Sequence, residues 1–267
     1  RVERGVYAPT KARGLAYALG LVGLAALAGE LLARALGRGA ALLAITWTAL
    51  GGRSLGREAR GIAAALDAGD LVRARAALPA LAGRDADELD AGGVCRAVVE
   101  SVAENTGDAV VGALLWGAVA GPAGVASYRA ANTLDAMVGH RSERYADFGW
   151  AAARLDDLMS WPAARAGAGL AVICAPVAGG SPRAAWRTLR RDGAAHPSPN
   201  AGRLEAAFAG ALGVRLGGPL SYGGRLEHRP QLGDGAAPGA ATVRRAVRLS
   251  VTIGAVATAA CAAAARR

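Results

Sequence analysis

Acidic side chains gather directly before an apolar run in the segment ESVAENTGDAVVGALLWGAV, residues 100–119. In a helix, Glu104 and Asp108 lie one turn apart and Glu100 lies one turn earlier, so the three carboxylates project from one side. Asn105 lies beside them. Like charges at this spacing repel each other unless a positive group lies among them. The segment therefore predicts a bound cation or a cluster of arginines.

Two later segments repeat this pattern of carboxylates at the end of an apolar run. Asn132 and Asp135 lie one helical turn apart within residues 127–139, which are expected to be helical. Asp156 and Asp157 come just before a further apolar run. Ionised groups at membrane depth are costly and tend to be functional. We expect the clusters to share one polar cavity, formed by Glu104, Asn105, Asp108, Asn132, Asp135, Asp156 and Asp157.

Further polar residues lie in two regions rich in Gly and Pro, residues 180–202 and 213–239, which are expected to be loops. The prolines of the sequence HPSPN exclude a helix around His196. We therefore expect this imidazole on a rigid turn, together with Ser198 and Asn200.

The composition predicts that membrane helices position these clusters. Of the 267 residues, 53% are hydrophobic and only 4% aromatic, and the mean hydropathy is +0.25, which is too apolar for an ordinary soluble domain of this size. None of the apolar runs contains the roughly 20 consecutive apolar residues of a comfortable span, so the helices must extend through flanking polar residues or enter the bilayer without crossing it. The candidate spans are residues 14–29, 39–52, 109–126, 161–178 and 249–265. A soluble Ala-rich helical protein is the alternative.

The charged residues argue against two chemistries and predict an orientation. Lys11 is the only lysine among the 31 basic residues of a chain with net charge +10, so neither a P-loop lysine nor a Schiff-base lysine is available beyond position 11. Phosphate must then be held by arginines, backbone N–H groups or a metal. Arginines are concentrated between the apolar runs, which predicts that residues 53–93 and 180–242 face the cytoplasm and contact lipid headgroups. Nucleic acid binding is not expected, because no basic stripe is interleaved with aromatic residues.

The expected fold is all-α, a polytopic membrane helical bundle in which residues 1–267 form a single domain. Residues 53–81 have apolar positions near helical spacing and predict one or two amphipathic helices, followed by an acidic turn at residues 85–93. The three cysteines are far apart in the sequence, so no disulfide framework or zinc site is expected.

Four motifs together resemble the CobD/CbiB family of cobalamin biosynthesis, the adenosylcobinamide-phosphate synthases. They are ESVAENTGDAVV, YRAANTLDAMVGHRSERYADFGWAAARLDDL, RDGAAHPSPNAG and GALGVRLGGPLSYGG, and the resemblance extends in the same order over residues 50–224. Compared with this family, we expect the apolar N-terminal helix to be missing from residues 1–267, and His140 stands where the family more often has an aromatic residue.

The resemblance implies a multi-pass enzyme of the bacterial inner membrane, with its active site toward the cytoplasm. Its reaction joins a propionate carboxyl of adenosylcobyric acid, a corrinoid, to aminopropanol or its O-phosphate as an amide. The ligation consumes ATP and needs a divalent metal such as Mg²⁺. A homo-oligomer or other enzymes of the pathway are possible partners of such a protein.

Candidate roles combine the resemblance with the chemistry of the side chains. Mg²⁺ prefers oxygen ligands, imidazole titrates near neutral pH, and arginines neutralise charge that develops on phosphoryl transfer. The catalytic candidates are Glu104, Asp108, His196 and Arg154. The metal candidates are Asp108, Asp135, Asp156 and Asp157. The substrate-binding candidates are Glu100, Asn105, Asn132, Asp135, Arg141, Glu143, Arg144, Ser198, Asn200, Arg215 and Tyr222.

Two other classes of protein fit the same residues. In an ion-coupled transporter the carboxylates would relay ions, although no apolar run carries a charge near its middle. A non-catalytic scaffold that gathers other enzymes of cobalamin synthesis at the membrane would need no metal.

Overall fold

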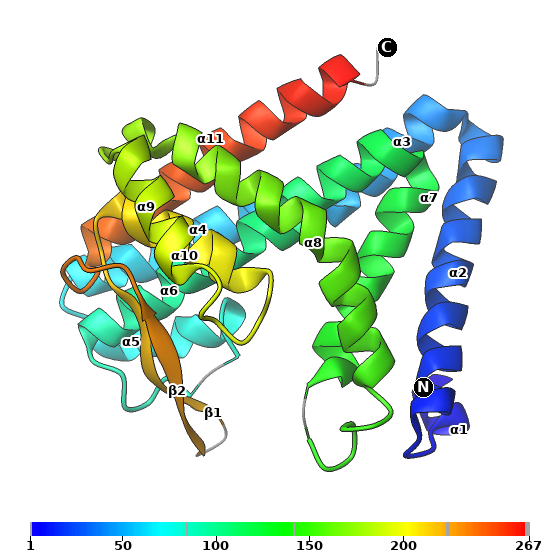
Figure 1. Cartoon of the computed structure of the whole chain (residues 1–267), viewed down its shortest axis with the longest axis horizontal. Coiled ribbons are helices and arrows are strands. Elements are labelled where there is room, and N and C mark those ends of the chain that lie inside the picture. The colour runs from blue at the N-terminus through cyan, green and yellow to red at the C-terminus, as the bar shows by residue number, and fades with distance from the viewer. Residues whose placement is uncertain (1, 84, 141, 223–224, 265–267) are drawn as a thin grey trace. The chain divides into compact units, whose positions relative to one another are not determined.

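The chain divides into two compact units, which are described separately (Figure 1). The computed structural model describes residues 2–83, 85–140, 142–222 and 225–264. Unit 1 consists of residues 1–50, 112–163 and 260–267, and unit 2 consists of residues 51–111 and 164–259.

Unit 1 is built from helices that pack through small residues. Its elements are α1 (Val2–Val6), α2 (Lys11–Leu36), α3 (Arg38–Ala49), α7 (Gly112–Leu134), the π-helix η3 (Asp135–Gly139) and the first part of α8 (Trp150–Ile173). Helices α2, α3 and α7 contact one another. A Cβ atom at Gly29 of α2 would lie 2.8 Å from the carbonyl oxygen of Pro122 in α7, so these two backbones approach closely only because Gly29 has no side chain.

Helix α7 is interrupted where Gly121 precedes Pro122. Gly121 has φ 62° and ψ −151°, a conformation that only glycine adopts without strain, and proline removes a backbone donor from the helix. The apolar segment of α7 is therefore two helical pieces joined at a kink.

In unit 2, helix α10 (Ala201–Leu212) is buried among other helices and a hairpin. The other elements are α4 (Gly52–Asp67), α5 (Leu71–Ala77), η1 (Leu78–Ala80), α6 (Ala91–Thr106), the π-helix η2 (Gly107–Val111), η4 (Ala175–Ala178), α9 (Pro182–Asp192), β1 (Leu216–Tyr222), β2 (Arg225–Leu232) and α11 (Ala240–Ala264). Nearly every residue of α10 is buried, and α10 contacts α6, α9 and both strands. Helix α4 buries Leu55, Ala59 and Ile62 along one face, which confirms the predicted amphipathic helix.

Both π-helices occur at the same local sequence pattern. Residues 103–111 read AENTGDAVV and residues 130–138 read AANTLDAMV, so each follows A-x-N-T-x-D-A-x-V. The first ends in η2 and the second leads into η3. Single π-turns of this kind are frequent at functional sites, and here each begins at or next to a carboxylate, Asp108 or Asp135.

The prediction that residues 180–202 and 213–239 are loops is wrong for most of both regions. Residues 182–192 form α9, which starts with Pro182 in its first turn after Ser181, a position that proline favours. Residues 216–222 and 225–232 pair as the antiparallel strands of the β1–β2 hairpin, so the described part of the chain is helical with one small two-stranded sheet. Proline is tolerated in this hairpin because a two-stranded sheet has only edge strands.

Within the described residues, three helical segments are long and apolar enough to cross a membrane: Lys11–Leu36, the segment Ala91–Gly139, which is kinked at Gly121, and Ala240–Ala264. They contain the expected spans 14–29 and 109–126 and residues 249–264 of the last expected span, whose final residue lies outside the described residues. This pattern is that of a membrane protein.

The other two expected spans are not among these three helical segments. Residues 39–52 fall largely in α3, whose 12 residues give a helix of only about 18 Å. Residues 161–178 begin inside α8 and end in the separate 3₁₀ turn η4. Helix α8 is long enough to cross, but it carries Asp156, Asp157 and Arg165 and is not among the three candidates.

Candidate functional site

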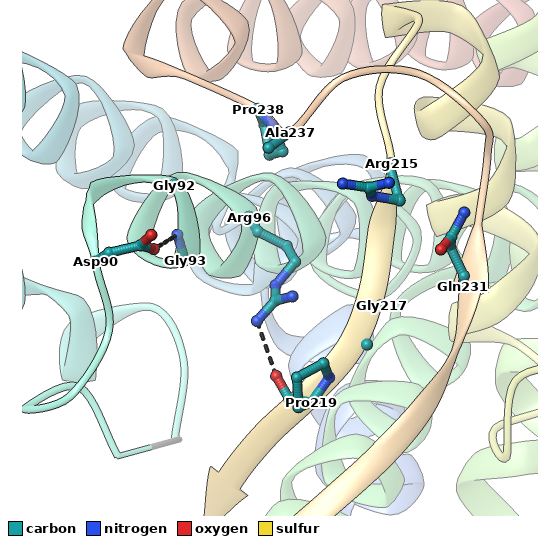
Figure 2. Close-up of a pocket in the computed structure, with 11 residues that line it drawn as sticks. Asp90, Gly92, Gly93, Arg96, Arg215, Gly217, Pro219, Gln231, Ala237 and Pro238 are labelled. Carbon is teal, nitrogen blue, oxygen red and sulfur yellow. Dashed lines mark hydrogen bonds between the residues drawn. The ribbon is translucent and has the colours of Figure 1, made fainter.

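A cavity of about 330 Å³ lies between the start of α6 and the β1–β2 hairpin in unit 2 (Figure 2). It is lined by Asp90, Gly92, Gly93, Arg96, Arg215, Gly217, Gly218, Pro219, Gln231, Ala237 and Pro238. The lining combines two guanidinium groups with glycine-rich backbone, which is the composition of an anion-binding site.

The two arginines reach the cavity from different elements. Arg96 is half-buried on the second turn of α6, and its Nη2 donates a hydrogen bond of 2.8 Å to the carbonyl oxygen of Pro219. Its Nε is buried and has no hydrogen-bond partner. Arg215 is exposed and directly precedes β1. Figure 2 shows both side chains between α6 and the hairpin.

Glycine is required in the strand that faces Arg96. Gly217 and Gly218 have φ values of 76° and 89°, and the pairing of β1 with β2 is irregular between Leu216 and Gly218. A Cβ at Gly217 would collide with the carbonyl oxygen of Pro230, and one at Gly218 would lie 3.1 Å from Nη1 of Arg96. The sequence LGGPL therefore lets the strand backbone approach both β2 and the guanidinium group.

One helical turn after Arg96, Glu100 contacts the same strand. Its Oε1 accepts a hydrogen bond of 2.7 Å from the backbone N–H of Gly217, and its side chain is almost fully buried, with a relative exposure of 3%. A buried hydrogen bond to a carboxylate is strong, and removal of this carboxylate would leave the Gly217 N–H unsatisfied.

A second buried cluster surrounds His196, which follows α9. Nδ1 of His196 accepts a hydrogen bond of 3.0 Å from the backbone N–H of Ser198, and Nε2 lies 2.6 Å from Nη1 of Arg229 on β2. The carboxylate of Glu205 on α10 lies 3.8 Å from Nε2, and both side chains are almost completely buried. Three separate elements thus meet at one imidazole.

This environment keeps His196 neutral. Burial, and then the positive charge of Arg229, lower the pKa of His196 from its ordinary 6.5 to about 4. Nδ1 accepts the hydrogen bond from the backbone N–H of Ser198, so this nitrogen carries no proton, as a neutral ring requires. His196 is therefore a weak base at neutral pH.

The expected rigid turn around His196 is confirmed. Residues 193–200 are not helical, and the hydroxyl oxygen of Ser198 accepts hydrogen bonds from the backbone N–H groups of Asn200 and Ala201, at the start of α10. Asn200 accepts a hydrogen bond of 2.9 Å from Nη1 of Arg165 in the part of α8 that belongs to unit 2.

The carboxylates of the opening motif do not share one environment. Glu100 is buried, Asp108 is half-buried and Glu104 is exposed. Asn105 donates to the backbone carbonyl and hydroxyl of Ser101 on its own helix. The π-helix that starts at Gly107 changes the rotation per residue, so the regular spacing assumed for a simple α-helix does not continue to Asp108.

Unit 1 contains a separate polar network between α7 and α8. Asp156 Oδ1 accepts hydrogen bonds from Asn132 Nδ2 at 3.3 Å and from the Ser160 hydroxyl at 3.4 Å, and Arg129 donates to Asn132. Burial, and then the nearby charge of Asp135, raise the pKa of Asp156 to about 7. Asn132, Asp135 and Asp156 are thus near one another, as expected.

The remaining predicted residues of unit 1 are more exposed. Arg154 forms an ion pair of 3.4 Å with Asp157, and Glu143 is exposed. Arg144 forms an ion pair of 2.9 Å with Glu3 and stacks 4.2 Å above the ring of Tyr7, so it ties the N-terminal segment to this loop. Arg141 and the side chain of Tyr222 lie outside the described residues.

The proposal of one shared polar cavity stays a prediction, because its two halves lie in different units. Glu104, Asn105 and Asp108 belong to unit 2, whereas the other four residues belong to unit 1. In the part of the chain that the structure describes, no three side chains of His, Cys, Asp or Glu come together as a metal site. A Mg²⁺ ion that also binds phosphate oxygens needs only one or two protein carboxylates, so single carboxylates such as Asp108 suit it in the presence of a nucleotide.

The sequence interpretation missed several residues of the site, chiefly Arg96, Glu205 and Arg229. Arg96 could have been found, because it precedes Glu100 by four residues and shares its face of the helix. Arg229 and Glu205 carried no such signal, because their role depends on the path of the hairpin and on the burial of α10.

The fold and the site define a helical membrane protein with a buried polar cluster and an arginine-lined cavity. The model of the family described as CobD/Cbib protein matches residues 1–250. The chain belongs to the CobD/CbiB family of cobalamin biosynthesis. No solved structure matches it.

Similar proteins support this membership. A protein of Mycobacterium tuberculosis named cobalamin biosynthesis protein CobD is 54% identical over 253 residues, which cover 94% of this chain and 81% of the relative. Proteins with the same name from Pelobacter propionicus and Rhodobacter capsulatus are 48% and 44% identical, over 70% and 80% of this chain and 58% and 69% of their own lengths.

Proposed function

We propose that this protein forms an amide between a propionate carboxyl of adenosylcobyric acid and the amino group of aminopropanol or aminopropanol O-phosphate, with consumption of ATP. Membership of the CobD/CbiB family supports a corrinoid substrate. The observation that carries the proposal is the arginine-lined cavity beside the buried Glu100 and the His196 cluster, since the reaction brings together anionic and phosphate-bearing reactants.

A carboxylate is a poor acyl donor, so the ligation needs activation of the propionate, and ATP supplies the phosphoryl group for it. The amine then attacks the activated carbonyl, the carbon–nitrogen bond forms, and phosphate leaves with the oxygen of the carboxylate. Arginines that line the cavity would neutralise the anionic groups that meet there. Divalent metal would be held by the carboxylate candidates Asp108, Asp135, Asp156 and Asp157, together with phosphate oxygens.

His196 is assigned a positioning role in this proposal. A pKa of about 4 makes it a poor acceptor for the proton of an ammonium group. Its contacts with Arg229, Ser198 and Glu205 instead fix the hairpin against α10 and the turn before it. The proton of the amine would leave through another group or through water.

We further propose that the enzyme lies in the bacterial inner membrane with residues 53–93 and 180–242 toward the cytoplasm, where ATP is available. Arginine-rich segments between apolar helices support this orientation. Lipid headgroups, a second copy of the chain or other enzymes of the pathway would be its partners there.

The test uses the full chain in detergent with ATP, Mg²⁺ and adenosylcobyric acid, and adds either aminopropanol or its O-phosphate. Mass spectrometry of the corrinoid should show a mass increase equal to the amine minus water, and only when ATP is present. Unchanged corrinoid with every amine, from protein that is folded and binds the corrinoid, would favour the scaffold instead.

A further inference from the structure

The cavity between α6 and the hairpin has more positive charge than its own residues neutralise. Arg96 and Arg215 both line it, and among the described residues neither forms an ion pair with a carboxylate. The one acidic residue of the lining is Asp90, and its Oδ1 accepts a hydrogen bond of 2.6 Å from the backbone N–H of Gly93 at the start of α6 (Figure 2). The lining therefore places two guanidinium groups against a single carboxylate, which already caps α6.

The donors of Arg96 are only partly used. Its Nη2 binds the carbonyl oxygen of Pro219, while its Nε is buried without a hydrogen-bond partner. A buried donor that stays unsatisfied destabilises a protein, so such groups usually have a ligand or water as partner. Arginine presents its donors as a planar fork that matches two oxygens of a phosphate.

The size of the cavity excludes the larger reactant. About 330 Å³ is at the lower end of small-molecule sites. A corrin macrocycle with its attached nucleoside is far too large for it, whereas a phosphate group with a short carbon chain fits. The glycines of the wall keep this space open, because a Cβ at Gly218 would lie 3.1 Å from Nη1 of Arg96.

We propose that this cavity binds the phosphoryl group of a small phosphate ester, with Arg96 and Arg215 on two sides of it. The inference rests on the proposed function for the identity of the ester. Two reactants carry such a phosphoryl group: the O-phosphate of the amine substrate and the nucleotide. The start of α6 is not the main contact, because Asp90 already caps it.

The experiment measures binding to the full chain in detergent, without turnover, by isothermal titration. The probes are inorganic phosphate, aminopropanol O-phosphate, free aminopropanol and a non-hydrolysable ATP analogue. Arg96→Gln and Arg215→Gln should each lower the binding affinity for the phosphate ester that occupies the cavity by about tenfold or more. Each substitution removes a charge-assisted hydrogen bond. Arg183→Gln is the matched control, since Arg183 is an exposed arginine of the same unit outside this cavity.

The pattern across the probes identifies the source. If the variants lose affinity only for aminopropanol O-phosphate, the cavity binds the phosphate of the amine. If they lose affinity only for the ATP analogue, the cavity binds a phosphate of the nucleotide. Arg215→Gln leaves the Pro219 contact intact, so its result counts even where Arg96→Gln disturbs the hairpin. If Arg215→Gln binds every phosphate probe as tightly as wild type and Arg183→Gln do, the inference is overturned.

Failure of this inference and failure of the proposed function are distinguishable. Amide formation by wild type with unchanged phosphate binding in the two variants would overturn the inference and leave the function standing. Weakened phosphate binding in the variants of a protein that makes no amide would support the site and overturn the function.

Discussion

The carboxylate of Glu100 accepts a hydrogen bond from the backbone N–H of Gly217, a residue 117 positions later in the chain. Arg96, one turn earlier on the same helix, donates to the carbonyl oxygen of Pro219 in the same strand. Helix α6 and strand β1 are thus joined by two side-chain contacts at the edge of the cavity. The acidic motif and the glycine-rich motif are two parts of one site in unit 2.

Substitution of Glu100 by alanine should destabilise unit 2. It leaves the buried N–H of Gly217 without an acceptor, which costs about 1–3 kcal/mol. Chemical unfolding in detergent measures this difference. Glu104→Ala is the matched control on the same helix, and because Glu104 is exposed its effect should stay within about 0.5 kcal/mol. Equal effects of the two substitutions would contradict the importance of the Glu100 contact.

Substitution of Asp108 by asparagine should slow amide formation if this carboxylate helps to hold Mg²⁺. The change keeps the shape of the side chain and removes one charge. Loss of a metal ligand or its support typically reduces metal affinity or activity by about 10- to 100-fold. Initial rates across a magnesium series should show partial recovery at high magnesium, with thermal stability measured in parallel. A rate equal to wild type at limiting magnesium removes Asp108 from the site.

Stability should fall in mildly acid solution because His196 is buried in its neutral form. Between its ordinary pKa of 6.5 and its lowered pKa of about 4, the unfolded chain binds a proton that the folded chain does not. The free energy of unfolding therefore decreases as the pH falls through this window, by at most about 3 kcal/mol from this group. The Tm of His196→Gln, measured from pH 7 to pH 5, should decline less steeply than that of wild type.

The control for this pH dependence is His228→Gln. His228 is exposed and lies on the same strand as Arg229, so its substitution should leave the wild-type slope unchanged. A slope that His196→Gln does not alter means that another group causes the acid sensitivity.

Asp156 should have the opposite effect on stability over a similar range of pH. Its pKa is raised from the ordinary 3.8 to about 7, so between these values the folded chain binds a proton that the unfolded chain does not. Ionised Asp156 is therefore unfavourable, and stability decreases as the pH rises through 7. Asp156→Asn should raise Tm more at pH 8 than at pH 5. Asp147→Asn changes an exposed carboxylate of the same unit and should show no such difference.

Local sequence patterns determined much of the helical structure. The apolar run at residues 14–29 lies in α2, and the spacing of Leu55 and Ile62 gave the amphipathic α4. The sequence HPSPN determined the turn at His196, because proline cannot donate a backbone hydrogen bond in a helix. Each of these features depends on residues within a few turns of one another. The four motifs also placed the chain in its family.

Some local sequence signals for helices were present, but the Gly and Pro content around them led to the prediction of a loop. Helix α9 is preceded by Ser181, begins at Pro182 and is followed by Gly193, which is a regular pattern of start and stop signals. The repeated pattern A-x-N-T-x-D-A-x-V likewise appears in the sequence, but its conversion into two π-helices depends on how α6 and α7 continue.

The partners of the site were decided only by the tertiary structure. The sequence alone determined that acids, arginines and a histidine occur beside apolar helices. It did not determine that Glu100 would contact Gly217 or that His196 would lie between Arg229 and Glu205. These contacts join residues that the chain brings together only after α10 is buried and the hairpin has formed. A hydrogen bond depends on distances of a few tenths of an ångström, and no spacing along the sequence specifies such distances between remote segments.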